Sequence, residues 1–249
     1  MNKTITCATW NVHRAQGRDG KIDPERVVSA IETAIAVHAP DILALQEADT
    51  DCPPHCGIFD LARIESVTGL RYAHDNDELR WGPESHGFLG TIMFVSTRFS
   101  VDHADVIDLP GHCHRGAISL ELTDSDVPFR AISTHLSLSQ PFRIAQMRIL
   151  GQYLTRRPKM QTIILGDLNE WRPWGGFALS KQMLGDRFLG PSIRSFPTRS
   201  PLLPLDRILT NVEGAITNPR AIDAPATELA SDHRPLLADV ALSCPESLP

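Results

Sequence analysis

Residues 163–171 read IILGDLNEW: an apolar run stops at a glycine, and an aspartate, an asparagine and a glutamate follow within four residues. A short apolar run that ends at glycine is typical of a buried β-strand. We therefore predict a strand at residues 162–166 (TIILG), with the polar residues at its carboxyl end. Two carboxylates and one amide in this place raise the question of what the strand end binds.

The segments around this strand indicate a mixed α/β arrangement. Residues 141–154 (PFRIAQMRILGQYL) repeat apolar side chains at helical spacing and lead into the strand. Two further runs, AISLEL at 117–122 and FRAIST at 129–134, are separated by TDSDVP, whose Asp, Ser and Pro are typical of a turn. These runs should pair as an antiparallel hairpin, so the sheet is not purely parallel.

The rest of the chain also combines strands and helices. Asp23 and Pro24 open a helix expected at 23–38, because Asp is a preferred N-cap and Pro is favoured at the first helical position. The remaining expected elements are strands at 4–10, 40–47, 89–96, 205–210 and 236–242 and a helix near 58–68. Residues 171–204 are rich in Gly, Pro and aromatic side chains and are expected to form a long loop with one short helix.

Length and composition favour one domain. With 249 residues and 42% hydrophobic content the chain can bury a full core, and we expect one domain over residues 1–249 with a frayed tail at about 244–249. A net charge of −6 argues against a global basic field that would attract nucleic acid. No apolar run is long enough for a signal peptide or a membrane span. We therefore expect a cytoplasmic protein without integral membrane association, and no protein partner is evident.

The five cysteines are odd in number and unevenly spread, which does not indicate a disulfide framework. Some of them lie close to histidines and form a candidate zinc cluster: Cys52, His55, Cys56, His112, Cys113 and His114. Their spacing is not that of a zinc ribbon. Loop thiols and solvated histidines are the alternative interpretation.

Unusual polar residues gather where predicted strands begin or end. They are Asn11, Glu47, His135, Asp167, Asn169, Asp206, Asp232 and His233. Taken singly, a carboxylate or amide after a strand is often a turn former or a cap, and a histidine is often a packed, hydrogen-bonded residue. A core has no need of all these residue types at strand ends together, so the sequence predicts one site that gathers them.

Seven motifs carry a family resemblance: TWNVH, LQE, RGAISLEL, THLS, GDLNE, LDRI and SDHRPL, in this order from about Thr9 to Leu237. Together they resemble the endonuclease/exonuclease/phosphatase superfamily. The resemblance implies an α/β (α+β) fold of the deoxyribonuclease-I-like kind, a four-layer α/β/β/α sandwich with two packed mixed sheets. Two differences separate this chain from the abasic-site repair branch: His13 replaces a metal-binding aspartate, and the THLS histidine is present. The details look closest to uncharacterised bacterial members.

Phosphoester hydrolysis explains the residue types. Mg²⁺, for which Mn²⁺ should substitute, prefers oxygen ligands, and Glu47, Asn11 and Asp232 are the expected metal ligands. Asp167 is expected to activate the attacking water, and Asn169 to donate to a phosphate oxygen.

A protonated histidine would add charge and a directed donor to the transition state. His233 fits this role, with Asp206 as the orienting carboxylate that the family pattern implies, and His135 is the second catalytic imidazole.

Substrate contacts are expected from the loops. Arg115 is the best candidate for phosphate binding, ahead of Arg172, Arg194 and Arg199, which are more often simply solvated. Trp171 and Trp174, directly after GDLNE, are expected to contact a base, a sugar or an acyl chain. Their alternative role is to cover the edge of the core.

The sequence therefore predicts a divalent-metal-dependent phosphoester hydrolase of the phosphodiesterase or endonuclease type. A phosphatase or phospholipase acting on small or lipid phosphoesters is the alternative, and a non-catalytic phosphate-binding module is a third possibility. The expected partner is a phosphoester substrate, either nucleic acid or a small or lipid phosphoester.

Overall fold

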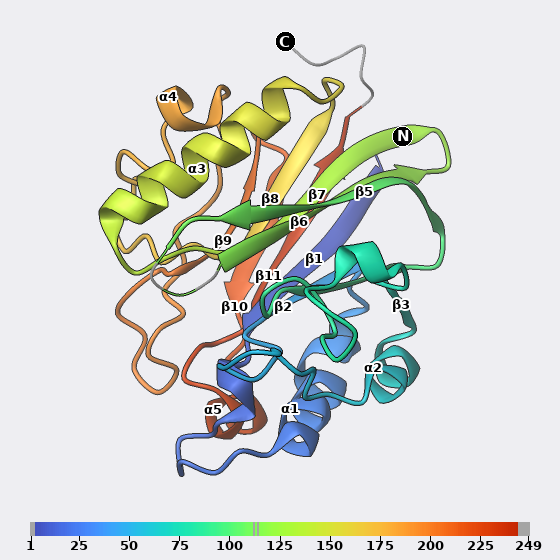
Figure 1. The fold of residues 1–249 in the computed structure, drawn as a ribbon, viewed down its shortest axis with the longest axis vertical. Helices are drawn as coiled ribbons and strands as arrows, with labels where there is room; N and C mark the ends of the chain where they lie inside the picture. The colour runs from blue at the N-terminus through green and yellow to red at the C-terminus, as the bar shows by residue number, and fades with distance from the viewer. Residues whose placement is uncertain (1–2, 112, 114, 244–249) are drawn as a thin grey trace.

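The computed structural model describes residues 3–111, 113 and 115–243, so the expected frayed tail at 244–249 lies outside the described residues. The strands form two sheets (Figure 1). The six-stranded sheet has the order β10 (Ile216–Ala221), β11 (Leu236–Leu242), β1 (Lys3–Asn11), β2 (Ile42–Gln46), β4 (Ile92–Ser96) and β3 (Leu70–Tyr72). The five-stranded sheet has the order β5 (Phe99–Leu109), β6 (Arg115–Asp124), β7 (Val127–His135), β8 (Gln161–Asp167) and β9 (Asp206–Thr210).

Each sheet is mixed. β1 pairs with β2 in parallel and β7 pairs with β8 in parallel, whereas the other neighbouring strands are antiparallel. The expected hairpin is confirmed: β6 and β7 pair antiparallel, with Asp124 opposite Val127 across the turn.

The inner faces of the two sheets pack on each other. Ile5 and Cys7 of β1 and Ile163 and Leu165 of β8 belong to one buried apolar cluster between the sheets. The next residue of β8, Ile164, points to the other face and packs into a second cluster with α3 (Gln140–Thr155) and α4 (Lys181–Leu184). Both faces of β8 are therefore buried, which explains its uninterrupted apolar sequence.

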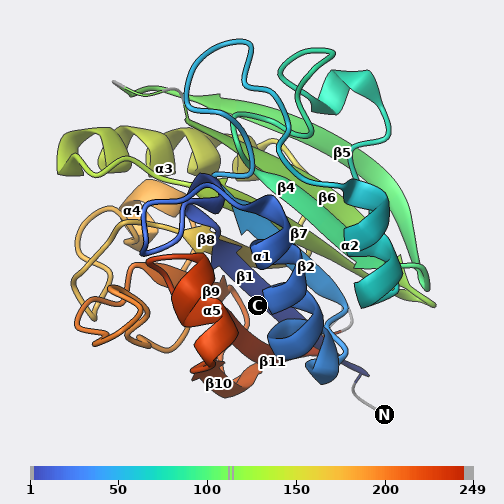
Figure 2. The same ribbon diagram turned by 90° about the horizontal axis from the view of Figure 1, so that it is seen from below.

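Helices cover both outer faces. α3 and α4 lie on the five-stranded sheet, while α1 (Pro24–Ala30), α2 (Leu61–Thr68) and α5 (Pro225–Ala230) lie on the six-stranded sheet (Figures 1 and 2). The predicted four-layer α/β/β/α sandwich is confirmed. Within the described part of the chain, no helix is long and apolar enough to cross a membrane.

Local sequence determines where the helices begin. The Asp23 carboxylate accepts a hydrogen bond from the Arg26 backbone nitrogen at 3.1 Å, and Pro24 occupies the first turn of α1. The helix expected at 23–38 continues past α1 as a π-helical turn at Ile31–Ile35 and a 3-10 turn at Ala36–His38. The residues around 171–204 form the expected long connection with one short helix, α4.

Several elements were not predicted, and each carries a weak pattern. β5 is an edge strand that carries Asp102, His103 and Asp105, and such charges protect an edge strand but obscure its apolar alternation. β10 is an edge strand of the six-stranded sheet, and both Pro219 and a register shift interrupt its pattern. β3 and α5 are too short for a periodic signal.

The register of the sheets brings the strand ends together. His135 lies beside Asp167 in the parallel β7–β8 pair, and Asp206 lies opposite Asp167 in the antiparallel β8–β9 pair. Gly166 makes this possible, because it has φ +142° and an added Cβ would lie 1.9 Å from the Thr134 carbonyl oxygen. The glycine of IILGD therefore allows β8 to approach β7 closely just before the polar cluster.

Candidate active site

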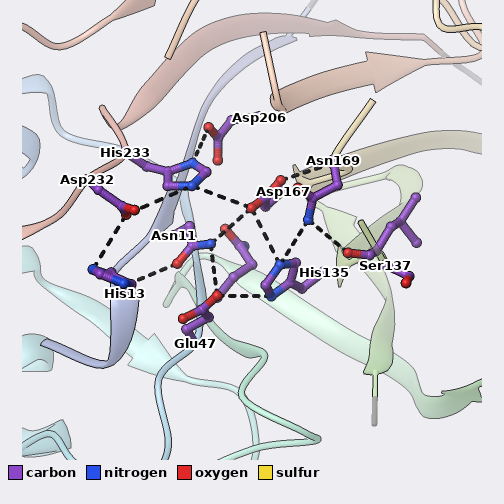
Figure 3. A network of polar contacts seen from close by, with 12 residues as sticks. Asn11, His13, Glu47, His135, Ser137, Asp167, Asn169, Asp206, Asp232 and His233 are labelled. Carbon is purple, nitrogen blue, oxygen red and sulfur yellow. Dashed lines mark hydrogen bonds and ion pairs between the residues drawn. The ribbon is translucent and has the colours of Figure 1, made fainter. Parts of the chain in front are cut away.

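A cavity of about 650 Å³ opens where the strand ends of the two sheets meet. The predicted catalytic and metal-binding residues that line it are Asn11, Glu47, His135, Asp167, Asn169, Asp232 and His233. Asp206 is fully buried and reaches the site through His233. The structure thus brings all eight strand-end residues into one polar network (Figure 3).

Asp167 lies at the centre of this network. Its Oδ2 accepts from the Asn11 side-chain amide at 2.9 Å and lies 3.4 Å from His135 Nε2 and 3.7 Å from His233 Nε2. Its Oδ1 accepts from the Asn169 backbone nitrogen at 3.0 Å. Burial raises the pKa of Asp167 to about 6, and the positive charge of His233 acts against this rise.

His233 is held as a charged donor. Its Nδ1 lies 2.8 Å from Asp206 Oδ2, and the Trp10 indole nitrogen donates to the His233 carbonyl at 2.9 Å. Burial alone would lower the pKa of His233. The carboxylates of Asp206 and Asp167 outweigh burial and raise the pKa to about 10, so His233 is protonated at neutral pH.

His135 has the opposite electrostatic environment. Burial, together with the positive charges of Arg115, His233 and Arg14, lowers the pKa of His135 well below its ordinary value. Its Nε2 lies 3.2 Å from the Asn169 side-chain amide, which also donates to the Leu136 carbonyl at 2.9 Å. The site therefore combines a charged imidazole and a neutral imidazole on either side of one carboxylate.

The expected metal ligands lie at the edge of this network. Glu47 Oε1 is 3.4 Å from the Asn11 amide and 3.9 Å from His135 Nδ1, while Glu47 Oε2 accepts from Arg14 at 2.6 Å. Asp232 Oδ1 is buried without a hydrogen bond in the described part of the chain, 3.6 Å from His13 Nδ1.

A different set of metal-capable atoms also lies close together. Oxygen and nitrogen atoms of Asp167, Asp206 and His233 fall within 4.8 Å of one another. In the described structure Asp206 Oδ2 is hydrogen-bonded to His233 Nδ1 at 2.8 Å, so a cation bound by all three residues would replace that contact. Among the expected ligands, Glu47 Oε2 accepts from Arg14 at 2.6 Å and Asn11 Oδ1 accepts from the His13 backbone nitrogen at 2.9 Å. Asp232 Oδ1 is buried without a hydrogen bond among the described residues.

The structure adds residues that the sequence analysis did not identify as site residues. Ser195 Oγ donates to Asp206 Oδ2 at 2.5 Å, and the Phe196 ring lies 4.9 Å from the His233 ring. Arg14 bridges Glu47 and Asp51, with 3.0 Å to the Asp51 carboxylate. Serine and phenylalanine in a loop carry no sequence signal for such roles. Arg14 directly follows the TWNVH motif, and this position could have identified it as a candidate site residue.

The expected substrate-binding residues separate into two groups. Arg115 and Trp171 line the cavity, and the Arg115 Nε is buried without a hydrogen-bond partner among the described residues. Trp174 is 76% exposed and does not line the cavity in the described structure. Arg172 pairs with Glu170 at 2.8 Å, and the remaining two arginine candidates, Arg194 and Arg199, are exposed.

The cysteine and histidine cluster does not assemble a metal site within residues 3–111, 113 and 115–243. His55 Nδ1 lies 3.1 Å from the Thr50 carbonyl, and Cys56 Sγ lies 3.0 Å from Glu84. Cys52 and Cys113 are exposed, and the four cysteines described are free. His112 and His114 lie outside the described residues.

Solved structures share this fold. A Bacteroides vulgatus endonuclease/exonuclease/phosphatase is 13% identical with a TM-score of 0.75 and covers 97% of this chain and 100% of its own. The human Nocturnin catalytic domain with bound sulfate is 22% identical with a TM-score of 0.67, covering 98% and 97%. Truncated Caenorhabditis elegans TDP2 is 19% identical with a TM-score of 0.68, covering 96% and 97%. At these identities the likeness shows the fold alone.

Sequence comparison finds a bacterial relative and a family. The uncharacterized Escherichia coli protein YbhP is 26% identical over 212 residues, which cover 74% of this chain and 83% of YbhP. Residues 8–233 match the Endonuclease/Exonuclease/phosphatase family, a span that includes every strand-end residue from Asn11 to His233. The chain therefore belongs to the endonuclease/exonuclease/phosphatase family.

Proposed function

We propose that this protein is a divalent-metal-dependent phosphoester hydrolase of the phosphodiesterase or endonuclease type. One observation carries the proposal: the buried Asp167 carboxylate contacts the Asn11 amide, His135 and His233 at the floor of an open cavity. A carboxylate with a pKa of about 6 is suited to take a proton near neutral pH. Family membership supports phosphoester hydrolysis in general.

The oxygen donors at the cavity edge fit a hard divalent cation. Enzymes of this family generally use divalent metals, and Asp232 Oδ1 is a buried oxygen that lacks a hydrogen bond in the described structure. We assign Glu47, Asn11 and Asp232 to Mg²⁺, with Mn²⁺ able to substitute, because carboxylate and amide oxygens are the ligands these ions prefer. When bound, the ion would neutralise phosphate oxygens.

Proton transfer and charge stabilisation then fall to the side chains. Asp167 accepts the proton of the attacking water, and its own geometry is fixed by the Asn169 backbone and the Asn11 amide. The Asn169 side chain, close to His135, donates to a phosphate oxygen as negative charge develops there.

The two histidines take different roles because their charges differ. His233, held protonated by Asp206 at 2.8 Å, donates to the phosphoryl group and balances its charge. His135 is neutral at pH 7. As the second imidazole, it donates a ring N–H hydrogen bond to the phosphoryl group or to the leaving oxygen. Arg115, whose Nε has no hydrogen-bond partner among the described residues, binds a phosphate oxygen.

A second candidate function is a phosphatase or phospholipase activity on small or lipid phosphoesters. Apolar side chains line part of the cavity, including Leu138, Trp171 and Leu203, and this favours an organic group without charge beside the phosphate. A non-catalytic phosphate-binding module is the weakest candidate, because the cavity holds carboxylate, amide and imidazole groups together. The cytoplasmic location stays a prediction.

Parallel turnover assays test the proposal. Purified protein is incubated with Mg²⁺, with Mn²⁺ and with a chelator on supercoiled plasmid, single-stranded RNA, inositol phosphates, sphingomyelin and a chromogenic phosphodiester. Metal-dependent cleavage that is lost in Asp167→Asn supports the proposal, and nucleic acid or lipid turnover selects between the two candidates. Absence of turnover on every substrate contradicts it.

A further inference from the structure

One part of the cavity lining is apolar. Its side chains, which we term the apolar wall, are Leu138, Trp171, Phe196, Leu203 and Leu205, and every other residue that lines the cavity is polar or charged. The wall residues come from the connection after β7, from the connection after β8 and from the segment before β9, three neighbouring strands of one sheet (Figure 1). The cavity is therefore amphipathic.

The apolar wall contacts the proposed catalytic residues directly. The Phe196 ring lies 4.9 Å from the His233 ring. Phe196 and Leu203 exchange backbone hydrogen bonds of 3.1 and 2.8 Å, and the Thr198 backbone nitrogen donates to the Asp232 carbonyl at 2.7 Å. These contacts hold the segment that carries Phe196 and Leu203, so this part of the wall is in place before a ligand binds and needs little ordering on binding.

Trp171 is also fixed in place. The Arg172 guanidinium lies over its ring at 4.8 Å from the centroid. Arg172 in turn donates to both oxygens of the buried Glu170 carboxylate, at 2.8 and 3.0 Å. One face of the indole is therefore covered by a charged neighbour.

The same connections carry further exposed apolar side chains outside the cavity lining. In the described part of the chain, six of the eleven exposed large hydrophobic side chains lie on these connections: Leu138, Trp171, Trp174, Phe177, Leu202 and Leu203. Leu138 is 78% exposed and Trp174 is 76% exposed. Apolar surface gathered in this way beside a cavity is typical of a binding surface.

The chemistry of the wall favours a hydrocarbon over a nucleobase. Its side chains carry one polar atom, the indole nitrogen of Trp171, whereas a base brings several donors and acceptors that lose water when they are buried. Both aromatic rings of the wall already have a ring or guanidinium neighbour, which leaves fewer faces for stacking. A net charge of −6 also disfavours a long polyanion.

We propose that the substrate is an amphiphilic phosphoester whose hydrocarbon group lies against the apolar wall while its phosphate lies near Asp167, His233 and Arg115. This inference rests on the proposed phosphoester hydrolysis and, within it, favours the second candidate, an activity on small or lipid phosphoesters, over an endonuclease. The phosphate site and the wall meet at His233, so a phosphate there would have its organic substituent within reach of Phe196.

The test measures binding, so that it does not depend on turnover. The dissociation constants of methyl-, butyl- and hexylphosphonate are measured by calorimetry on the Mg²⁺-containing protein. Affinity should rise roughly two- to threefold for each added methylene until the wall is covered. Leu138→Gln should weaken hexylphosphonate about fivefold and leave methylphosphonate unchanged, because Leu138 contacts only the organic group in this arrangement.

A matched variant controls for the substitution itself. Leu229→Gln changes another exposed leucine, 54% exposed on α5 and outside the cavity lining, and should leave all three constants unchanged. Equal affinity for methyl- and hexylphosphonate, no binding of any of them, or tighter binding of thymidine monophosphate than of hexylphosphonate would overturn the inference. A chain-length dependence in a protein that hydrolyses no phosphoester would instead refute the proposed function and keep the wall as a binding surface.

A further measurement identifies the source of the amphiphile. The protein, with and without Leu138→Gln, is sedimented with vesicles of phosphatidylcholine, whose zwitterionic headgroup has no net charge. Cosedimentation that the variant reduces assigns the hydrocarbon to a membrane lipid. A chain-length dependence without cosedimentation assigns it to a dissolved phosphoester.

Discussion

The polar floor of the cavity, formed by the eight strand-end residues, and the apolar wall differ in where their residues lie and in how they are held. Floor residues such as His135, Asp167 and His233 sit at or near strand ends and are 3%, 1% and 5% exposed, each fixed by polar partners. Wall residues such as Leu138 and Trp171 sit on connections and are 78% and 50% exposed. The sheets therefore position the groups proposed for chemistry, while the connections supply the surface proposed for selectivity.

The largest effect is expected at the centre of the floor. Asp167→Asn should lower kcat about 10³-fold, because an amide cannot accept the proton of the attacking water. Steady-state kinetics on the best substrate from the turnover assays measures this, with circular dichroism as a check that the fold is kept. Turnover near the wild-type rate would remove Asp167 from the mechanism and break the assignment of chemistry to the floor.

The Asp206–His233 pair should behave as one unit. Asp206→Asn and His233→Gln are each expected to lower kcat about 10²-fold, and the double variant should be little worse than either, since both remove the same charged donor. A double-mutant cycle on kcat tests this. Fully additive losses would mean that the two residues act separately and that the 2.8 Å contact does not orient His233.

The same pair should make stability depend on pH. The pKa of His233 is raised from 6.5 to about 10 in the folded protein, so its contribution to stability is fully present below pH 6.5 and is lost as the pH rises through about 10. In a chelator, the free energy of unfolding of the wild type should fall by on the order of 3 kcal/mol relative to His233→Gln between pH 7 and pH 10. The free energy of unfolding of each protein is measured by denaturant titration at several pH values. An equal change with pH in the two proteins would contradict this.

The floor was predictable from the sequence because strand ends are predictable. Apolar runs that stop at Asn11, Glu47 and Asp167 locate the ends of β1, β2 and β8, and the chemical types of the residues there point to one site. What the sequence does not contain is the distance between the two sheets, so the contact of the Asn11 amide with Asp167 at 2.9 Å appears only in the folded chain.

The wall was less predictable, because its residues have no periodicity. Trp171 and Trp174 stand three positions apart in the same loop, and the sequence offered no reason to separate them. Only tertiary contacts distinguish them: Trp171 lines the cavity, whereas Trp174 does not in the described structure. Ser195 contacts Asp206, and Phe196 contacts His233. Both contacts depend on the conformation of a long loop, which secondary-structure propensity does not predict.

Arg115, the first residue of β6, lines the cavity but belongs to neither part, and its substitution should show an intermediate effect. Arg115→Gln is expected to raise KM about tenfold with a smaller change in kcat, since one charge-assisted hydrogen bond to phosphate is lost in both ground and transition states. Arg199→Gln, at an exposed arginine outside the cavity lining, is the matched control and should be neutral. An unchanged KM in Arg115→Gln would show that the phosphate lies elsewhere.

The smallest effects separate Trp171 from Trp174 and define where the wall ends. Trp171→Ala should raise KM about fivefold for an ester with a hexyl group and hardly at all for the methyl ester, because the indole lines the cavity and a methyl group does not reach it. Trp174→Ala should change either KM less than about twofold, since contacts outside the cavity contribute little when the ligand ends within it. Comparing the two variants on both esters cancels general effects of removing an exposed tryptophan. If Trp174→Ala has the larger effect on the hexyl ester, the hydrocarbon leaves the cavity over the loop after β8, and the wall must be extended to include Trp174 and Phe177.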